Sequence, residues 1–251
     1  MRSSNPVLKR AFETARMGWG SMTAANRSTV MTLQGTINKT LALSVLLVAG
    51  AGYAVWQMTT IANPYTLMWL SIGGGLVVAL VTSFRPDWAP VTAPIYAVLE
   101  GIALGVISFF FEQIYPGIVA QAIGLTMSVF VVMLLGYKAG VIRATETFRS
   151  IVVSATMAIF VVYLMTWILR MFSWEVPYIH GSGIIGIVFS LIVVVVAALN
   201  LILDFDFIEQ ASEDGSMPKY MEWYAGFGLL VTLVWLYIEI LKLLAKLRND
   251  D

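Results

Sequence analysis

Long apolar stretches, separated by short polar ones, repeat along most of the chain. Seven windows of roughly 20 mainly apolar residues follow a polar start, and a helix needs about this length to cross ~30 Å of hydrocarbon. The pattern therefore predicts an all-α membrane bundle of seven spanning helices. The predicted spans are Leu41–Met58, Tyr65–Phe84, Val91–Phe111, Ile118–Tyr137, Ile151–Phe172, Gly183–Asp204 and Trp223–Leu244.

The composition agrees with a membrane protein and narrows its partners. Hydrophobic residues make up 59% of the 251 residues and charged residues only 12%, compared with about 25% charged residues in soluble domains. The formal net charge is zero, which argues against a nucleic acid partner because no net field attracts one. We therefore expect an integral membrane protein whose partners are the lipid bilayer and molecules within or beside it.

The distribution of basic residues predicts the orientation. Residues 1–39 hold six Lys or Arg and the single acid Glu13, so we expect a basic cytoplasmic arm, followed by a membrane domain over residues 40–248. With this arm inside, eleven Lys and Arg lie on the inner side and four on the outer side, as is typical of a cytoplasmic N-terminus. The basic C-terminal tail would then lie outside. A re-entrant last segment would return it to the cytoplasm, and both arrangements stay open.

Two acids stand at the end of the sixth window. Asp204 and Asp206 follow a run of valines, where low dielectric and the negative end of a helix both disfavour a carboxylate. On a helix, Asn200 and Asp204 share one face, and Asp206 shares another with Glu209. The acids either mark the point where the helix enters water or form a proton- or cation-responsive site.

Two further carboxyl groups fall inside predicted spans. Glu100 lies about midway along the third span, a depth at which a lone carboxylate usually faces the bundle interior. A structural hydrogen bond and a place in an ion path are both consistent with this position. Glu239, in the last span, has Lys242 three residues later, and an intrahelical ion pair is the plainer explanation for it.

Patterns typical of catalysis are missing from the sequence. The chain has no Cys and one His, His180, and it contains neither a His-Glu-x-x-His pattern nor a nucleophile elbow. The sequence therefore predicts no enzyme activity and no cofactor. Ca²⁺ takes six to eight oxygen ligands, and weak coordination of this ion by Asp204 and Asp206 is the metal interaction that we expect.

One motif resembles a known family. The segment from Arg85 to Gly105 reads Arg-Pro-Asp-Trp-Ala-Pro-Val-Thr-Ala-Pro-Ile-Tyr-Ala-Val-Leu-Glu-Gly-Ile-Ala-Leu-Gly, and Phe205-Asp206 follows later. Together these stretches resemble the transmembrane Bax inhibitor family in its bacterial branch, over most of residues 40–248 and without the arm. The resemblance implies a seven-helix bundle with a central last helix, which would act as a pH-sensitive calcium leak in the bacterial cytoplasmic membrane.

The resemblance also implies roles for single residues. In that family two aspartates on the last two helices share a proton, and a basic residue on the second helix can latch to one of them. The first aspartate falls on Asp206, with Asp204 as an additional acid. The position of the second aspartate holds Thr232, and the nearest acid is Glu239. Arg85 is the latch candidate by its position.

Two functions of different classes follow. The first is a Ca²⁺ leak gated by protonation, with Asp206 as the principal switch. The second is a non-transporting regulator that binds a membrane protease or a quality-control partner, with the basic arm as the contact. Flux through the purified protein separates them, because a regulator moves no ion. The expected ion-path and pH-sensing residues are Asp206, Asp204, Glu209, Asn200, Glu100, Glu239 and Thr232.

Overall fold

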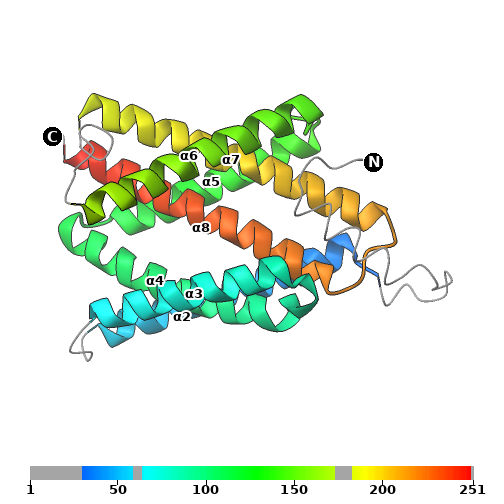
Figure 1. Cartoon of the computed structure of the whole chain (residues 1–251), viewed down its shortest axis with the longest axis horizontal. Helices are drawn as coiled ribbons and strands as arrows, with labels where there is room; N and C mark the ends of the chain where they lie inside the picture. Colours follow the sequence, from blue (N-terminus) through cyan, green and yellow to red (C-terminus); the bar gives the residue numbers. More distant parts are fainter. Residues whose placement is uncertain (1–29, 59–63, 173–182, 250–251) are drawn as a thin grey trace. The chain divides into compact units, whose positions relative to one another are not determined.

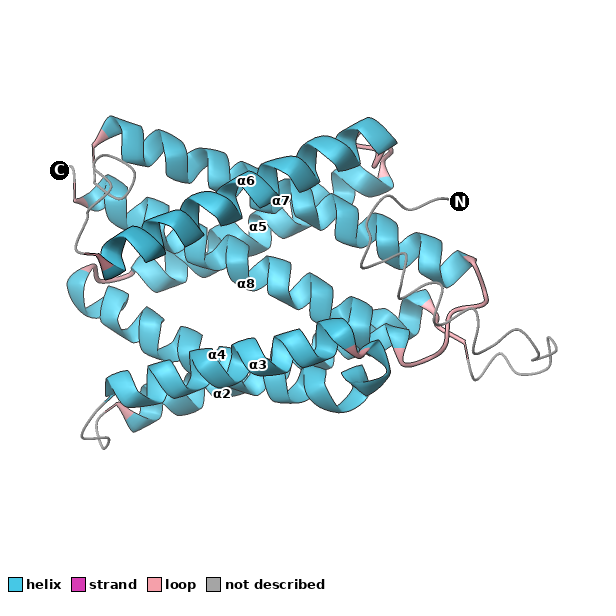
Figure 2. Ribbon diagram, viewed as in Figure 1, coloured by secondary structure: helices cyan, strands magenta, loops and turns pink. Residues whose placement is uncertain are grey.

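Seven long helices account for most of the structure, a computed structural model that describes residues 30–58, 64–172 and 183–249 (Figures 1 and 2). Each is long and apolar enough to cross a membrane, which confirms the predicted all-α, seven-span fold. His180 lies outside the described residues. The elements are α2 (Leu33–Gln57), α3 (Pro64–Phe84), the 3₁₀ helix η2 (Pro86–Trp88), α4 (Ala89–Ile114), α5 (Ile118–Lys138), α6 (Glu146–Met171), α7 (Ile184–Glu213) and α8 (Met221–Arg248).

Three helices extend well beyond their apolar windows. Helix α2 begins at Leu33, so the predicted end of the arm at Lys39 lies within a helix. Helix α6 begins at Glu146, and α7 continues to Glu213. The predicted end of the sixth span at Asp204 was therefore wrong, and both acids of that region lie inside α7. Hydropathy marks apolar surface, whereas an α-helix pairs its own backbone N–H and C=O groups and can continue beyond the apolar run.

The chain divides into two compact units. Unit 1 comprises Met1–Ile107 and Phe207–Leu230, and unit 2 comprises Ser108–Asp206 and Val231–Asp251. The boundaries fall within α4, α7 and α8. Each unit has its own buried apolar cluster.

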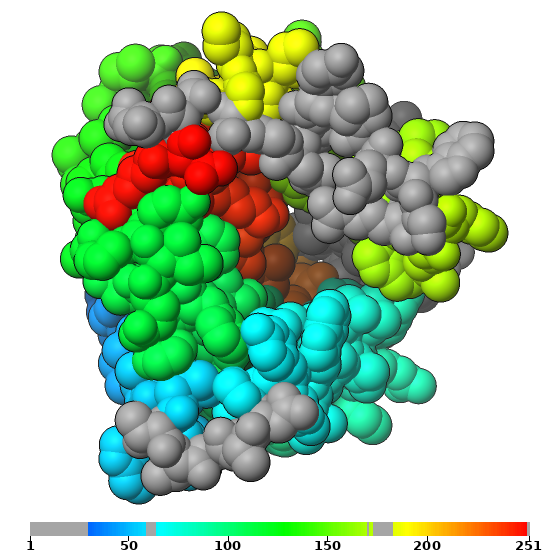
Figure 3. All heavy atoms as spheres, turned by 90° about the vertical axis from the view of Figure 1, so that its left-hand side faces the viewer, coloured from blue at the N-terminus to red at the C-terminus, as the bar shows by residue number. Residues whose placement is uncertain are grey.

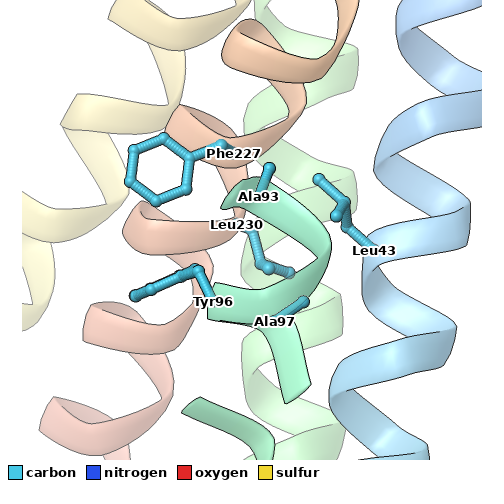
Figure 4. Close-up of a cluster of buried hydrophobic side chains, with 6 residues drawn as sticks. All are labelled: Leu43, Ala93, Tyr96, Ala97, Phe227 and Leu230. Atoms are coloured by element: carbon cyan, nitrogen blue, oxygen red, sulfur yellow. The ribbon is translucent and has the colours of Figure 1, made fainter. Parts of the chain in front are cut away.

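The core of unit 1 joins α2, α4 and α8. The ring of Tyr96 meets that of Phe227 edge-on at 4.9 Å, and Leu43 packs beside them (Figure 4). Helices α2 and α4 approach so closely that a Cβ atom on Gly101 would collide with the main chain of Leu47. Small residues at such a contact let backbones touch in lipid, where apolar burial alone does not draw helices together.

The first turns of α2 and α8 are tied together within unit 1. The Glu222 carboxylate, 1% exposed, accepts hydrogen bonds from the Thr32 amide at 3.1 Å and the Thr32 hydroxyl at 2.9 Å. Further along, Thr40 lies against Gly226. Contacts that advance together along both helices show that α2 and α8 run parallel, and α8 continues without a break to Arg248. A re-entrant last segment would need a break that α8 does not have.

The loop before α8 also meets the turn between α3 and α4. Tyr220 lies near Asp87 of η2. Burial, together with the Asp87 carboxylate, raises the pKa of the Tyr220 hydroxyl above its ordinary value. This end of unit 1 is therefore held by several short segments at once.

Candidate functional site

A row of polar side chains follows one face of α6 inside unit 2. Arg149, Thr156 and Tyr163 stand at intervals of seven residues, which keeps them on one side of a helix over about 21 Å. Each of them bonds a polar side chain of α7 or α8. We call the whole set the polar seam: Arg149, Thr156 and Tyr163 of α6; Ser190, Asn200, Asp204 and Asp206 of α7; and Thr232, Glu239, Lys242 and Lys246 of α8.

One end of the polar seam is an ion pair between α6 and α7. The Arg149 Nη2 atom lies 2.7 Å from Asp206 Oδ2, and the two side chains are 18% and 13% exposed. The Tyr137 hydroxyl donates a long hydrogen bond of 3.5 Å to the other carboxylate oxygen. Charge-assisted bonds in a shielded place are stronger than neutral ones. Asp206 therefore already has a cationic partner in this state.

Asp204 faces a different neighbour from Asp206. Its carboxyl group hydrogen-bonds the Thr232 side chain of α8, while its Oδ2 atom is shielded from solvent and accepts no hydrogen bond. Two residues along a helix rotate a side chain by about 200°, which explains why one acid meets α8 and the other α6. One turn earlier, the Asn200 amide donates to Thr156 at 2.8 Å. Asp204 is thus a shielded carboxyl group with one oxygen still able to take a proton or a cation.

The middle of α8 contributes a second buried acid. The Glu239 carboxylate, 1% exposed, accepts from the Tyr163 hydroxyl at 2.9 Å and from Lys242 Nζ at 3.0 Å. The expected pair between Glu239 and Lys242 therefore forms. The ammonium group of Lys242 also lies 5.1 Å from the centre of the Tyr163 ring. Both carboxylate oxygens of Glu239 accept a hydrogen bond, whereas the Oδ2 atom of Asp204 accepts none.

The opposite end of the polar seam is basic. Lys246 Nζ donates to the Gly186 carbonyl at 3.0 Å and to the Ser190 hydroxyl at 2.9 Å. Ser190 and Asp204 are as far apart on α7 as Lys246 and Thr232 are on α8, so the two helices run antiparallel in one register. Arg248, two residues later, donates to the Pro116 carbonyl in the turn between α4 and α5, seen beside the red end of α8 in Figure 3.

The remaining candidate residues belong to unit 1. The Glu100 carboxylate reaches α3, where one oxygen lies 3.3 Å from the place that a Cβ atom of Gly75 would occupy. Glu209 is exposed near the end of α7. Arg85 is exposed at the end of α3, and its carbonyl accepts the first bond of η2 from Trp88. The roles predicted for Glu100, Glu209 and Arg85 stay predictions.

The structure brings five of the predicted residues into unit 2 and adds partners that the sequence did not suggest. Asn200, Asp204, Asp206, Thr232 and Glu239 all belong to the polar seam. From the sequence, Arg149 counted only as one of the eleven basic residues on the inner side, and Tyr163 was not singled out. Their spacing of seven residues with Thr156 was the available signal.

The acids of the polar seam do not converge on one point. Across the described ranges, no group of three or more His, Cys, Asp or Glu side chains lies close enough to hold a metal ion. Asp204 and Asp206 face different helices. A cation at either acid would therefore complete its shell with hydroxyl groups, carbonyl groups or water, a weak arrangement for an ion that takes six to eight oxygen ligands.

Comparison with known proteins finds one matching family. A family model described as Bax inhibitor 1 like matches residues 5–249. No curated protein matches the chain. The match begins in the N-terminal arm, so the similarity extends further than residues 40–248, over which the motifs resembled the family.

Proposed function

The chain belongs to the Bax inhibitor 1 like family, and we propose from this premise and from the polar seam that it is a cation leak controlled by carboxyl protonation. It is an integral multi-pass membrane protein, and Ca²⁺ is the cargo that the family resemblance favours. In this proposal, cations move along the polar seam. An ionised carboxylate attracts them, and a protonated one does not.

The state of Asp204 is the observation that carries the proposal. A carboxylate in apolar surroundings is costly unless protons, cations or hydrogen-bond donors compensate its charge. Thr232 bonds this carboxyl group, and its shielded Oδ2 atom accepts no hydrogen bond. A proton and a cation therefore compete for the same oxygen, and this competition makes passage depend on pH.

The partners of the two acids favour Asp204 over Asp206 as the switch. Asp206 already pairs with Arg149 at 2.7 Å, so its charge is compensated before any cation arrives. In the proposal Arg149 takes the part that the sequence suggested for Arg85, because it is the cation in contact with Asp206. Loss of the Asp206 charge would release Arg149 into the polar seam.

A cytoplasmic N-terminus in a bacterial cytoplasmic membrane is part of the same proposal. The asymmetry of eleven basic residues against four supports it. Three of the four basic residues that weaken the asymmetry have partners within unit 2, since Lys242, Lys246 and Arg248 all donate to oxygen atoms there. An odd number of spans would put the two ends of the chain on opposite sides of the membrane, and the seven helices that are long and apolar enough to cross it support this part of the proposal.

Flux through the purified protein tests the proposal. Proteoliposomes loaded with a calcium indicator should admit Ca²⁺ faster than protein-free vesicles, and the rate should rise as the pH is raised, because carboxylates ionise. Arg149→Gln should change the rate, whereas Arg143→Gln, a matched change in the loop before α6, should not. A rate equal to that of protein-free vesicles at every pH would overturn the leak and favour the non-transporting regulator.

A further inference from the structure

We infer that the turn between α3 and α4 binds the headgroup of an aminophospholipid, a zwitterionic lipid that carries a primary ammonium group and a phosphate. The inference does not depend on the proposed leak, because it concerns unit 1 and requires no ion to cross the membrane. It rests on a pocket in this turn, on the depth of the pocket in the membrane and on the charges beside it.

A pocket of about 310 Å³ lies where η2 leads into α4. The described residues that line it are Asp87, Trp88, Pro90, Val91 and Thr92. Ligand pockets begin at about 300 Å³, so this space suits a lipid headgroup and is too small for a whole lipid. The carboxylate and the indole offer polar and aromatic contacts to a headgroup, and the two aliphatic side chains offer an apolar contact to the glycerol next to it.

Hydrogen bonds hold the chain around the pocket. The Thr92 side chain is buried, and its hydroxyl group donates to the Trp88 carbonyl at 3.1 Å. The same hydroxyl lies 2.7 Å from that of Thr82 on α3. The Trp88 amide donates in turn to the Arg85 carbonyl at 3.0 Å. The pocket is therefore formed before a ligand arrives, which lowers the entropic cost of binding.

The pocket lies at the depth of the lipid headgroups. Helices α3 and α4 are both long and apolar enough to cross the membrane, and only Arg85 and η2 separate them, so the turn between them lies at a membrane surface. Phe84, Trp88 and Val91 are each more than half exposed. Exposed aromatic side chains at the end of a span are typical of the interface between hydrocarbon and water. A headgroup is therefore a ligand that the membrane itself supplies to this pocket.

The charges beside the pocket match those of an aminophospholipid. Asp87 is exposed, so its carboxylate can accept hydrogen bonds from an ammonium group, and the Trp88 ring attracts the same cation. Arg85, two residues earlier, is also exposed, and a guanidinium group suits a phosphate. Tyr220 lies near Asp87, and since the pKa of its hydroxyl is raised, it stays uncharged at neutral pH and leaves the carboxylate charge in place. A headgroup without a cation would bring its phosphate to this carboxylate with nothing to offset the repulsion.

Lipid binding measured by native mass spectrometry tests the inference. The full chain in detergent is titrated with phosphatidylethanolamine, with the same lipid acetylated at its nitrogen, and with phosphatidylglycerol, all with identical acyl chains. The wild-type protein should bind phosphatidylethanolamine about threefold more tightly than the other two, as expected for one exposed ion pair. Asp87→Asn should remove this preference, whereas Asp214→Asn, the same change at another exposed aspartate, should keep it.

Each result decides the inference. Equal affinities for the three lipids in the wild-type protein would overturn it and would show a lipid surface without headgroup specificity. A preference that persists in Asp87→Asn would overturn it as well, because the headgroup would then bind elsewhere on the protein. If this variant does not fold, Trp88→Leu replaces it, and an unchanged preference there would count against the pocket. The leak is tested separately by ion flux, so either proposal can fail without the other.

Discussion

The two units use similar apolar helices in different ways. In unit 1, the helices meet through close backbone contact, as at Gly101 against Leu47, and through apolar side chains. In unit 2, the spans also contain ion pairs, with Arg149 on Asp206 and Lys242 on Glu239. Apolar packing carries no charge that a proton or a cation can alter, whereas an ion pair within a span can be altered by either. We therefore associate unit 1 with stability and propose that unit 2 responds to protons and cations.

The largest expected effect breaks the packing of unit 1. Gly101→Ala adds a Cβ atom that collides with the Leu47 main chain, and backbone cannot move aside as a side chain can. We expect a loss of about 3 kcal/mol in the free energy of unfolding, measured by denaturation in detergent. Gly73→Ala is the matched control, because a Cβ atom there meets nothing within 4 Å. Equal losses in the two variants would show that the contact between α2 and α4 is loose.

The next effect breaks the ion pair of unit 2. Arg149→Gln leaves the shielded Asp206 carboxylate without its cation, and we expect a loss of about 2 kcal/mol in the free energy of unfolding. Asp206→Asn in the same protein should recover part of this loss, because no charge then remains unpaired. A double-mutant cycle measures the coupling. Strictly additive losses would mean that the 2.7 Å contact contributes no coupling.

A smaller effect compares two tyrosines within unit 2. Tyr163→Phe removes the 2.9 Å hydrogen bond to buried Glu239, and we expect a loss of about 1 kcal/mol in the free energy of unfolding. Tyr137→Phe removes the 3.5 Å contact with Asp206 and should cost less, because long hydrogen bonds are weak. A larger loss in Tyr137→Phe would contradict the ranking of the two contacts.

How much of this the sequence predicts depends on whether a feature is local. Span count and helix type follow from runs of apolar residues, since the bilayer imposes them on each helix separately. The end of α7 does not follow from such runs, because Asp204 and Asp206 are accommodated by Thr232 and Arg149, which lie far away in the sequence. Pairing of this kind depends on the register between helices.

The candidate site shows the same division. The acids were visible because charge is rare inside a span, and the pair of Glu239 with Lys242 was visible because its partners are three residues apart. The role of Tyr163 was not visible in the sequence, since an aromatic residue in an apolar window is typical of any spanning helix. Arg149 lies just before the predicted span that starts at Ile151, and it joined the site only because α6 begins earlier, at Glu146.

The pH profile of cation flux through Asp204→Asn is the most direct test of Asp204 as the protonation switch. Asparagine keeps a polar group near Thr232 but cannot ionise, so we expect a slower flux that no longer changes with pH. Asp214→Asn, the same substitution at an exposed residue bonded to Ser216, should keep the wild-type profile. A wild-type pH profile in Asp204→Asn would show that Asp204 is not the switch.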